Sequence, residues 1–161
     1  MYILDTSALI TYSKNYPQDI DRSKWEFIDS LIKKGKFISN EKVKIEISKY
    51  EGHDYLRDVF IKKYKGIFLP INKIENWSYN TLKEIIELDQ NKHLGLIKQQ
   101  DKYFGDPADP YVLCQAKCSS KGKLVTNTVV TGDKALVNAC KYYQVDVIWP
   151  LDLFRRENKK F

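Results

Sequence analysis

The first ten residues, MYILDTSALI (Met1–Ile10), hold the pattern that decides the fold. Three apolar residues lead directly into Asp5, and Thr6 and Ser7 follow before a second apolar run begins. This order predicts a short buried strand that ends in a carboxylate, with a helix starting directly after it. In open α/β sheets, ligands bind beyond the carboxyl ends of the strands. Two interpretations of Asp5 therefore fit the decapeptide: a residue that takes part in chemistry, and a simple cap of the following helix.

The composition is typical of a globular protein. The chain has 161 residues, of which 43% are hydrophobic and 30% are charged, and we expect one domain over residues 1–161. No segment is apolar over the length that a membrane helix needs, and the three cysteines do not suggest a disulfide framework. These features predict a cytoplasmic protein that does not contact a membrane. The net charge of +6 favours a polyanionic partner such as nucleic acid.

Beyond the decapeptide, strand patterns alternate with helical patterns along the chain. We predict the further strands over Lys36–Ser39, Ile67–Pro70, Lys123–Thr126 and Val145–Trp149. We predict helices over Ser7–Lys14, residues 22–34, Glu41–Tyr50, Asp54–Lys65, Asn72–Asp89, Pro110–Ser119, Leu136–Tyr143 and Leu151–Arg156, with a loop over Gln90–Ala108. This alternation predicts an α/β fold in which helices cover both faces of a parallel sheet.

A second carboxylate with apolar neighbours is Glu46, in the helix predicted over Glu41–Tyr50. Val43, Ile47 and Tyr50 mark the side of this helix that we expect to be buried, and Glu46 lies on the same side. A carboxylate in that position costs free energy unless a positive group compensates it. The alternative is an edge position from which the side chain reaches solvent.

Two later segments place acidic residues beside predicted helix starts. The segment GDPADPYVL (residues 105–113) contains Asp106 and Asp109, of which Asp109 would cap the helix. Asp-Pro is also an ordinary signal for a turn or a helix start. The segment VVTGDKAL (residues 129–136) contains Asp133, which follows an apolar pair and precedes a helix, as Asp5 does. A plain helix cap is the alternative for Asp133.

Carboxylates that converge on one pocket repel one another unless a cation joins them. Mg²⁺ and Mn²⁺ prefer oxygen ligands and retain several waters. Such an ion polarises a phosphoryl oxygen and generates a hydroxide, which is the usual route of metal-assisted phosphodiester hydrolysis. The chain contains no GxGxxG motif, no P-loop and no zinc pattern of cysteine and histidine. The acidic residues therefore indicate hydrolysis of nucleic acid.

On these segments the chain resembles the PIN domain, the nuclease fold of VapC-type toxin ribonucleases. YILDTSALI matches the opening of that family, Glu46 fits its second acid, and ADPYVLCQAK (residues 108–117) fits the helix with its third. The tail LVNACKYYQVDVIWPLDLF (residues 136–154) resembles a DUF4411-type subfamily. The resemblance implies a three-layer α/β/α sandwich with a central, mostly parallel sheet of four or five strands. It also implies that Asp5, Glu46 and Asp109 bind Mg²⁺ or Mn²⁺, with Thr6 or Ser7 in support.

The PIN family usually has one more acid shortly after the fourth strand, in a Thr-x-Asp or Thr-x-Glu setting. If that strand is Leu124–Thr126, the matching position is Thr128, which is not acidic. If the strand is Val129–Thr131, the matching residue is Asp133. Counting along the chain favours the first strand, and the local motif favours the second. We take Asp133 as the fourth metal ligand and catalytic carboxylate, with Asp106 as a substitute.

The resemblance further implies a metal-dependent endoribonuclease that acts as the toxin of a toxin–antitoxin pair. Its partners would be the RNA substrate and an antitoxin protein, and many members of the family self-associate, which suggests a homodimer. An alternative is a non-catalytic PIN-fold protein that binds nucleic acid or acts as a scaffold and has a degenerate metal site. A nuclease for branched DNA is a third alternative, which the absence of a DNA-clamping module disfavours.

Overall fold

The centre of the molecule is a parallel sheet in a computed structural model that describes residues 1–51, 55–97 and 107–157. The strands are β1 (Tyr2–Leu4), β2 (Phe37–Asn40), β3 (Phe68–Leu69), β4 (Thr128–Val130) and β5 (Val147–Ile148). They form a five-stranded sheet in the order β3-β2-β1-β4-β5, in which every neighbouring pair is parallel. The central strand, β1, is buried along its whole length, as expected for a strand covered on both faces.

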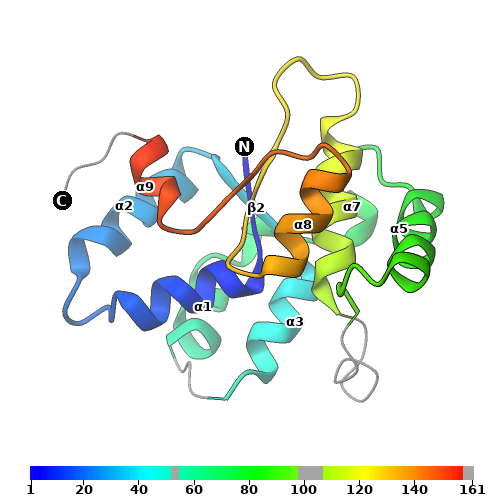
Figure 1. Cartoon of the computed structure of the whole chain (residues 1–161). Helices are drawn as coiled ribbons and strands as arrows, with labels where there is room; N and C mark the ends of the chain where they lie inside the picture. The colour runs from blue at the N-terminus through cyan, green and yellow to red at the C-terminus, as the bar shows by residue number, and fades with distance from the viewer. Residues whose placement is uncertain (52–54, 98–106, 158–161) are drawn as a thin grey trace.

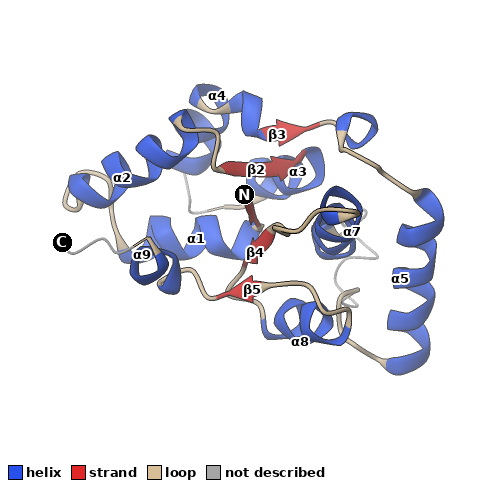
Figure 2. Cartoon of the chain, turned by 90° about the horizontal axis from the view of Figure 1, so that it is seen from above, coloured by secondary structure: helices blue, strands red, loops and turns tan. Residues whose placement is uncertain are grey.

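Helices cover both faces of this sheet, which confirms the α/β fold and its three layers (Figures 1 and 2). The helices are α1 (Thr6–Asn15), α2 (Arg22–Lys33), α3 (Glu41–Lys49), α4 (Ile61–Lys63), α5 (Tyr79–Lys92), α7 (Ala108–Ser120), α8 (Lys134–Tyr142) and α9 (Asp152–Arg156). In Figure 2, α1, α2 and α9 lie on one side of the sheet, and α7 and α8 lie on the other, with α5 outside α7. None of the helices in the described ranges is long and apolar enough to cross a membrane.

Three strands of the sheet run into a helix through a polar capping residue. Asp5 follows β1 and accepts a hydrogen bond from the Ser7 N–H, and Asn40 ends β2 and accepts from the first turn of α3. Asp133 follows β4 after two residues and accepts from the first turn of α8. These caps satisfy N–H groups that a helix start leaves without partners. They also gather polar side chains at the carboxyl end of the sheet.

The strand predicted over Lys123–Thr126 is wrong, because the fourth strand is β4. Val129 and Val130 are fully buried, whereas Leu124 and Val125 are 105% and 81% exposed. Both segments have the short apolar pattern of a strand, but β1 pairs with the second one, with Ile3 opposite Val129. The first segment instead belongs to the loop that projects from the top of the molecule in Figure 1.

Two predicted helices are interrupted in the structure. The described part of the segment predicted over Asp54–Lys65 forms a π-helical turn, η1 (Tyr55–Phe60), then α4 and a 3₁₀ turn, η2 (Lys65–Ile67). The segment predicted from Asn72 begins with a 3₁₀ turn, η3 (Ile71–Lys73), and α5 starts only at Tyr79. Ser78 determines this start, because its hydroxyl accepts a hydrogen bond from the Thr81 N–H at 3.2 Å.

The predicted cap of α7 also needs correction. Pro107 occupies the cap position, so Asp109 lies in the first turn of the helix. The N–H of Ala108 donates to Glu46 at 2.8 Å instead of to a local cap. The helix therefore begins at Ala108, two residues earlier than the Asp-Pro signal indicated.

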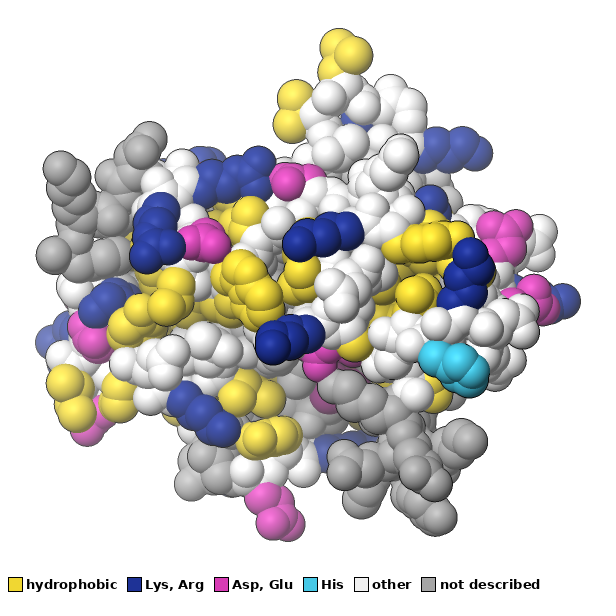
Figure 3. Space-filling model, viewed as in Figure 1, with side chains coloured by type: hydrophobic (Ala, Val, Ile, Leu, Met, Phe, Trp, Pro, Cys, Tyr) yellow, Lys and Arg dark blue, Asp and Glu magenta, His cyan; other side chains and the backbone are white. Residues whose placement is uncertain are grey.

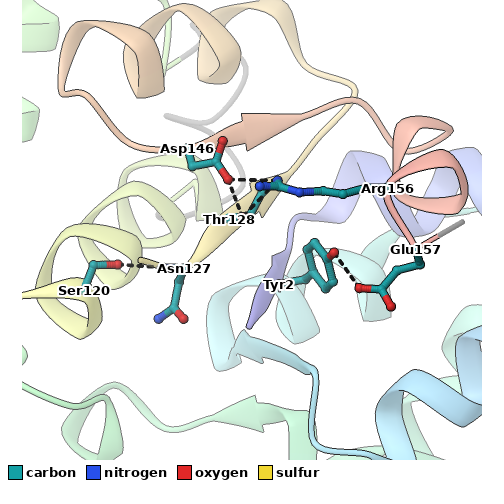
Figure 4. Close-up of polar contacts among 7 residues, drawn as sticks. All are labelled: Tyr2, Ser120, Asn127, Thr128, Asp146, Arg156 and Glu157. Carbon is teal, nitrogen blue, oxygen red and sulfur yellow. Dashed lines mark hydrogen bonds and ion pairs between the residues drawn. The ribbon is translucent and has the colours of Figure 1, made fainter. Parts of the chain in front are cut away.

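At the amino end of the sheet, ion pairs attach the C-terminal helix α9 to the strands (Figure 4). Arg156 donates to Asp146 at 2.8 Å, and the Thr128 hydroxyl donates to the same carboxylate at 2.5 Å. Glu157 accepts from the Tyr2 hydroxyl and from Lys36, both at 2.7 Å. The two contacts of Glu157 link residues that lie more than 100 positions apart and so stabilise the tertiary fold.

Candidate active site

All four carboxylates predicted from the sequence line one small pocket at the carboxyl ends of β1 and β4. The pocket has a volume of about 160 Å³. Its lining comprises Asp5, Thr6, Ser7, Ile10, Glu46, Pro107, Asp109 and Asp133. We call it the carboxylate pocket. Asp106, the substitute ligand considered from the sequence, lies outside the described residues. Residues from α1, α3, α7 and the start of α8 thus meet at one end of the sheet.

Asp5 is the most deeply buried acid of the pocket, with a relative exposure of 1%. Its Oδ2 accepts hydrogen bonds from the hydroxyls of Ser7 at 2.6 Å and Thr131 at 2.8 Å. Its Oδ1 is buried and has no hydrogen-bond partner. Burial raises the pKa of Asp5, and the hydrogen bonds from Ser7 and Thr131 oppose this rise. An unmatched buried carboxylate oxygen costs free energy, and a bound cation would remove that cost.

The hydroxyls that hold Asp5 are themselves attached to the loop between β4 and α8. The Thr131 hydroxyl accepts from the Asp133 N–H at 3.0 Å, and the Ser7 hydroxyl accepts from the Gly132 N–H at 2.8 Å. Gly132 leaves space for this approach, since a Cβ atom there would lie 3.3 Å from the Thr11 hydroxyl. Asp5 and Asp133 are therefore connected through Thr131. Sequence analysis did not identify Thr131 as a site residue, although it lies in the VVTGD motif.

Glu46 joins two helices beside Asp5. Its Oε2 accepts from the Thr6 hydroxyl at 2.5 Å, and its Oε1 accepts from the Ala108 N–H at the start of α7. The positive end of the α7 dipole thus stabilises the partly buried carboxylate of Glu46. This interaction offsets the free-energy cost of burial that was expected from the sequence. Tyr50, which we expected on the buried side of α3, is 40% exposed.

Asp133 combines the two roles that the sequence left as alternatives. Its Oδ1 caps α8 by accepting from the N–H groups of Ala135 at 2.8 Å and Leu136 at 3.2 Å. The same residue lines the carboxylate pocket. Asp5 also caps its helix and lines the pocket, so capping and a position in the pocket do not exclude each other.

The pKa of the buried Cys140 thiol reflects the negative charge of the carboxylates around it. Cys140 lies on α8, where burial raises its pKa to about 12. The charges of Asp5 and Asp109 contribute to the rise, because a second negative charge beside them is unfavourable. The two carboxylates therefore act on the same interior space from different helices.

Comparison with known proteins assigns the family. A family model described as "Domain of unknown function (DUF4411)" matches residues 2–161. The chain belongs to this DUF4411 family. The crystal structure of FitAcB from Neisseria gonorrhoeae matches this DUF4411 chain with a TM-score of 0.53 and 18% identity, over 94% of this chain and 99% of that chain. No curated protein matches its sequence. The fold is thus PIN-like, and both the DUF4411 membership and the α/β fold expected from the sequence are confirmed.

The donor set of the DUF4411 pocket fits a hard divalent cation, but the carboxylates do not form a preformed site. In residues 1–51, 55–97 and 107–157, no three His, Cys, Asp or Glu side chains are grouped so that they could hold a metal ion. Glu46 and Asp133 direct oxygens to the N–H groups of α7 and α8. All the candidate donors are carboxylate oxygens, which Mg²⁺ and Mn²⁺ prefer. The unmatched Oδ1 of Asp5 is the atom that most needs such an ion.

Proposed function

We propose that this DUF4411 protein is a metal-dependent endoribonuclease that acts as the toxin of a toxin–antitoxin pair. The observation that carries the proposal is the carboxylate pocket, which Asp5, Glu46, Asp109 and Asp133 line together and in which the buried Oδ1 of Asp5 has no hydrogen-bond partner. The PIN-like fold and the resemblance to VapC-type toxins support the choice of nucleic acid as the substrate. Under this proposal residues 1–161 form one nuclease domain that works in the cytoplasm.

Each acidic residue of the pocket has a defined task in the proposed reaction. Asp5, Glu46, Asp109 and Asp133 would hold Mg²⁺ or Mn²⁺, which when bound polarises the phosphate and lowers the pKa of water. Asp5 keeps one orientation because two hydroxyls hold its Oδ2, and Glu46 connects Thr6 to the start of α7. Asp133 is oriented by the first turn of α8. Ordered ligands reduce the reorganisation that metal binding requires.

The positive net charge of the chain supplies the attraction for the substrate. The net charge of +6 favours the phosphate backbone of RNA, and this attraction weakens as salt concentration rises. An antitoxin protein would inhibit the enzyme by covering the pocket, and a homodimer is the expected form of the toxin. These partners follow from the family resemblance and complete the proposal.

Cleavage assays with a matched pair of variants test this function. Purified protein is incubated with RNA in Mg²⁺, in Mn²⁺ and in EDTA, and Asp5→Asn is compared with Asp146→Asn. Asp146 is the same residue type at the opposite end of the sheet, where it binds Arg156. We expect metal-dependent cleavage by the wild type and by Asp146→Asn, and none by Asp5→Asn. Absence of cleavage by the wild type with either metal, or equal cleavage by Asp5→Asn, would overturn the proposal.

A non-catalytic nucleic-acid-binding protein is the second candidate, favoured by one observation. The described acidic side chains are not already grouped for a metal ion. Calorimetric titration with Mn²⁺ separates the two candidates. A nuclease should bind Mn²⁺ in a way that Asp5→Asn and Asp109→Asn each weaken, whereas a degenerate site should show no binding that depends on these residues.

A further inference from the structure

The segment that follows β5 carries an exposed tryptophan at the same end of the sheet as the carboxylate pocket. Because the sheet is parallel, Trp149 follows the carboxyl end of β5 just as Asp5 follows that of β1. Trp149 and Leu151 are each 42% exposed. The mechanism proposed above uses neither residue.

Hydrogen bonds connect this segment closely to Asp5. The C=O of Ile148 accepts from the Thr131 N–H at 3.2 Å, and the hydroxyl of Thr131 donates to Asp5. Pro150 packs beside Gly132, whose added Cβ would lie 3.8 Å from the Pro150 ring. One residue on each side of Trp149 therefore contacts the loop that positions the carboxylates.

The same contacts hold the segment rigid. The C=O of Pro150 accepts a hydrogen bond at 2.8 Å from the hydroxyl of Tyr12, which is fully buried. Pro150 also fixes its own backbone dihedral angle. A ring carried by a rigid backbone loses little conformational entropy when it binds a ligand. This favours Trp149 as a binding surface over a side chain that only happens to reach solvent.

The surface around this segment combines hydrophobic and positively charged side chains, as surfaces that bind nucleic acid do. On the face shown in Figure 3, hydrophobic side chains gather over the connection from α8 to α9, and Lys and Arg side chains lie between them. Lys134, directly after Asp133, is exposed. Proteins that bind single strands combine cations for the backbone with aromatic rings for the bases.

We propose that Trp149 forms a stacking subsite that binds one unpaired base of single-stranded RNA beside the carboxylate pocket. The inference rests on the proposed nuclease function and defines its substrate further. A base can stack on a side chain only when its face is free, and in a duplex the faces are covered by neighbouring pairs. The subsite therefore selects unpaired RNA over duplex RNA.

Fluorescence anisotropy of a labelled RNA in EDTA measures binding without cleavage. Trp149→Ala should weaken binding of the single strand about 5- to 150-fold, the range expected for loss of one stacked base. Trp149→Phe retains an aromatic face and should stay within a few-fold of the wild type. Tyr142→Ala is the matched control, because Tyr142 is 50% exposed but lies at the other end of α8. Binding of the annealed duplex should not change in Trp149→Ala.

Thermal melting of each variant verifies folding, and Trp149→Leu, which keeps an apolar side chain, replaces Trp149→Ala if that variant does not fold. If Trp149→Ala and Trp149→Leu bind the single strand as tightly as Tyr142→Ala, Trp149 does not form a stacking subsite. Cleavage by the wild type would then still support the nuclease. If the wild type neither binds nor cleaves RNA, the nuclease proposal fails and the subsite fails with it. A change in oligomeric mass in Trp149→Ala with unchanged RNA affinity would assign this surface to a protein contact and overturn the subsite.

Discussion

The two ends of the sheet use the same residue types in opposite ways. At the amino end, Asp146 pairs with Arg156 (Figure 4), Glu157 pairs with Lys36, and both carboxylates are partly exposed. At the carboxyl end, Asp5 is buried and its Oδ2 is held by neutral hydroxyl groups. At each end, a threonine on or next to β4 donates a hydrogen bond to a carboxylate. Thr128 donates to Asp146 at the amino end, and Thr131 donates to Asp5 at the carboxyl end.

The direction of the pKa shift separates the two ends. Lys36 is the main reason that the pKa of Glu157 lies below its ordinary value. Burial acts upward on Asp146, but hydrogen bonds from Thr128 and Arg156 outweigh it, and the pKa is lowered. Burial raises the pKa of Asp5. The amino end therefore stabilises the charged form in the folded chain, whereas the carboxyl end tolerates a charge that the fold alone does not favour.

The largest expected contrast concerns stability in the presence of metal. Asp5→Asn should raise the free energy of unfolding in EDTA by about 1–3 kcal/mol, because it removes a buried charge with an unmatched oxygen. The wild type should gain about 2.7 kcal/mol at a Mn²⁺ concentration 100 times its dissociation constant, and Asp5→Asn should lose this gain. Denaturant titrations with and without Mn²⁺ measure both effects. An equal Mn²⁺ gain in both proteins would contradict the assignment of Asp5.

Two threonine substitutions compare the ends directly. Thr131→Val removes the hydroxyl that contacts Asp5 and the Asp133 N–H, and should weaken Mn²⁺ binding about 10- to 100-fold, as loss of a group that orients a ligand does. Thr128→Val is the control three residues earlier, and should leave Mn²⁺ affinity unchanged. Calorimetry gives both affinities. If Thr131→Val and Thr128→Val lose the same affinity for Mn²⁺, the metal site does not depend on the hydroxyl that holds Asp5.

Removal of the cation at the amino end should have a smaller effect. Arg156→Met deletes the pair with Asp146, whose two side chains are 45% and 40% exposed, so the expected loss of stability is about 1 kcal/mol or less. RNA cleavage should remain at the wild-type rate, because the pair is remote from the carboxylate pocket. A loss of cleavage without a loss of stability would show that the two ends are coupled.

The smallest effect is the acid dependence of stability at the amino end. The pKa values of Asp146 and Glu157 are lowered from 3.8 and 4.5 respectively, so the folded chain binds fewer protons than the unfolded chain in this pH range. Their contribution is complete above the ordinary pKa values and is lost as pH falls through the lowered ones. Urea titrations between neutral and acidic pH should show that the free energy of unfolding falls less on acidification for Arg156→Met than for the wild type. An identical pH profile in the two proteins would mean that the Asp146–Arg156 pair contributes nothing measurable to the pH dependence of stability.

Local patterns in the sequence were sufficient for the caps at Asp5 and Asp133 and for the buried side of α3 at Val43 and Ile47, but not for the cap of α7 or for Tyr50. Asp5 and Asp133 each follow an apolar run and precede a helix, and both are caps as the pattern indicated. Glu46 was found from its position relative to Val43 and Ile47, both of which are fully buried. These predictions depend on the geometry of one helix or one turn, which residue spacing determines.

Long-range pairing decided the features that the sequence left open or missed. Both Leu124–Thr126 and Val129–Thr131 match a strand, and only pairing of β4 with β1 distinguishes them. That choice makes Asp133 the residue that follows the fourth strand at the pocket. Thr131 is significant because its hydroxyl lies 2.8 Å from a carboxylate 126 positions earlier in the chain. No local pattern carries such a contact.

By itself the sequence determined the alternating α/β order, the central apolar strand and the acidic residue that follows it. Burial periodicity and capping depend on neighbours within a few positions, so these features can be deduced from the sequence alone. Only the tertiary structure decided which apolar run entered the sheet, how the hydroxyl of Thr131 holds Asp5 and that Trp149 lies at the same end. Each of these depends on packing between distant segments, where many arrangements satisfy the same local preferences and the shared core selects one.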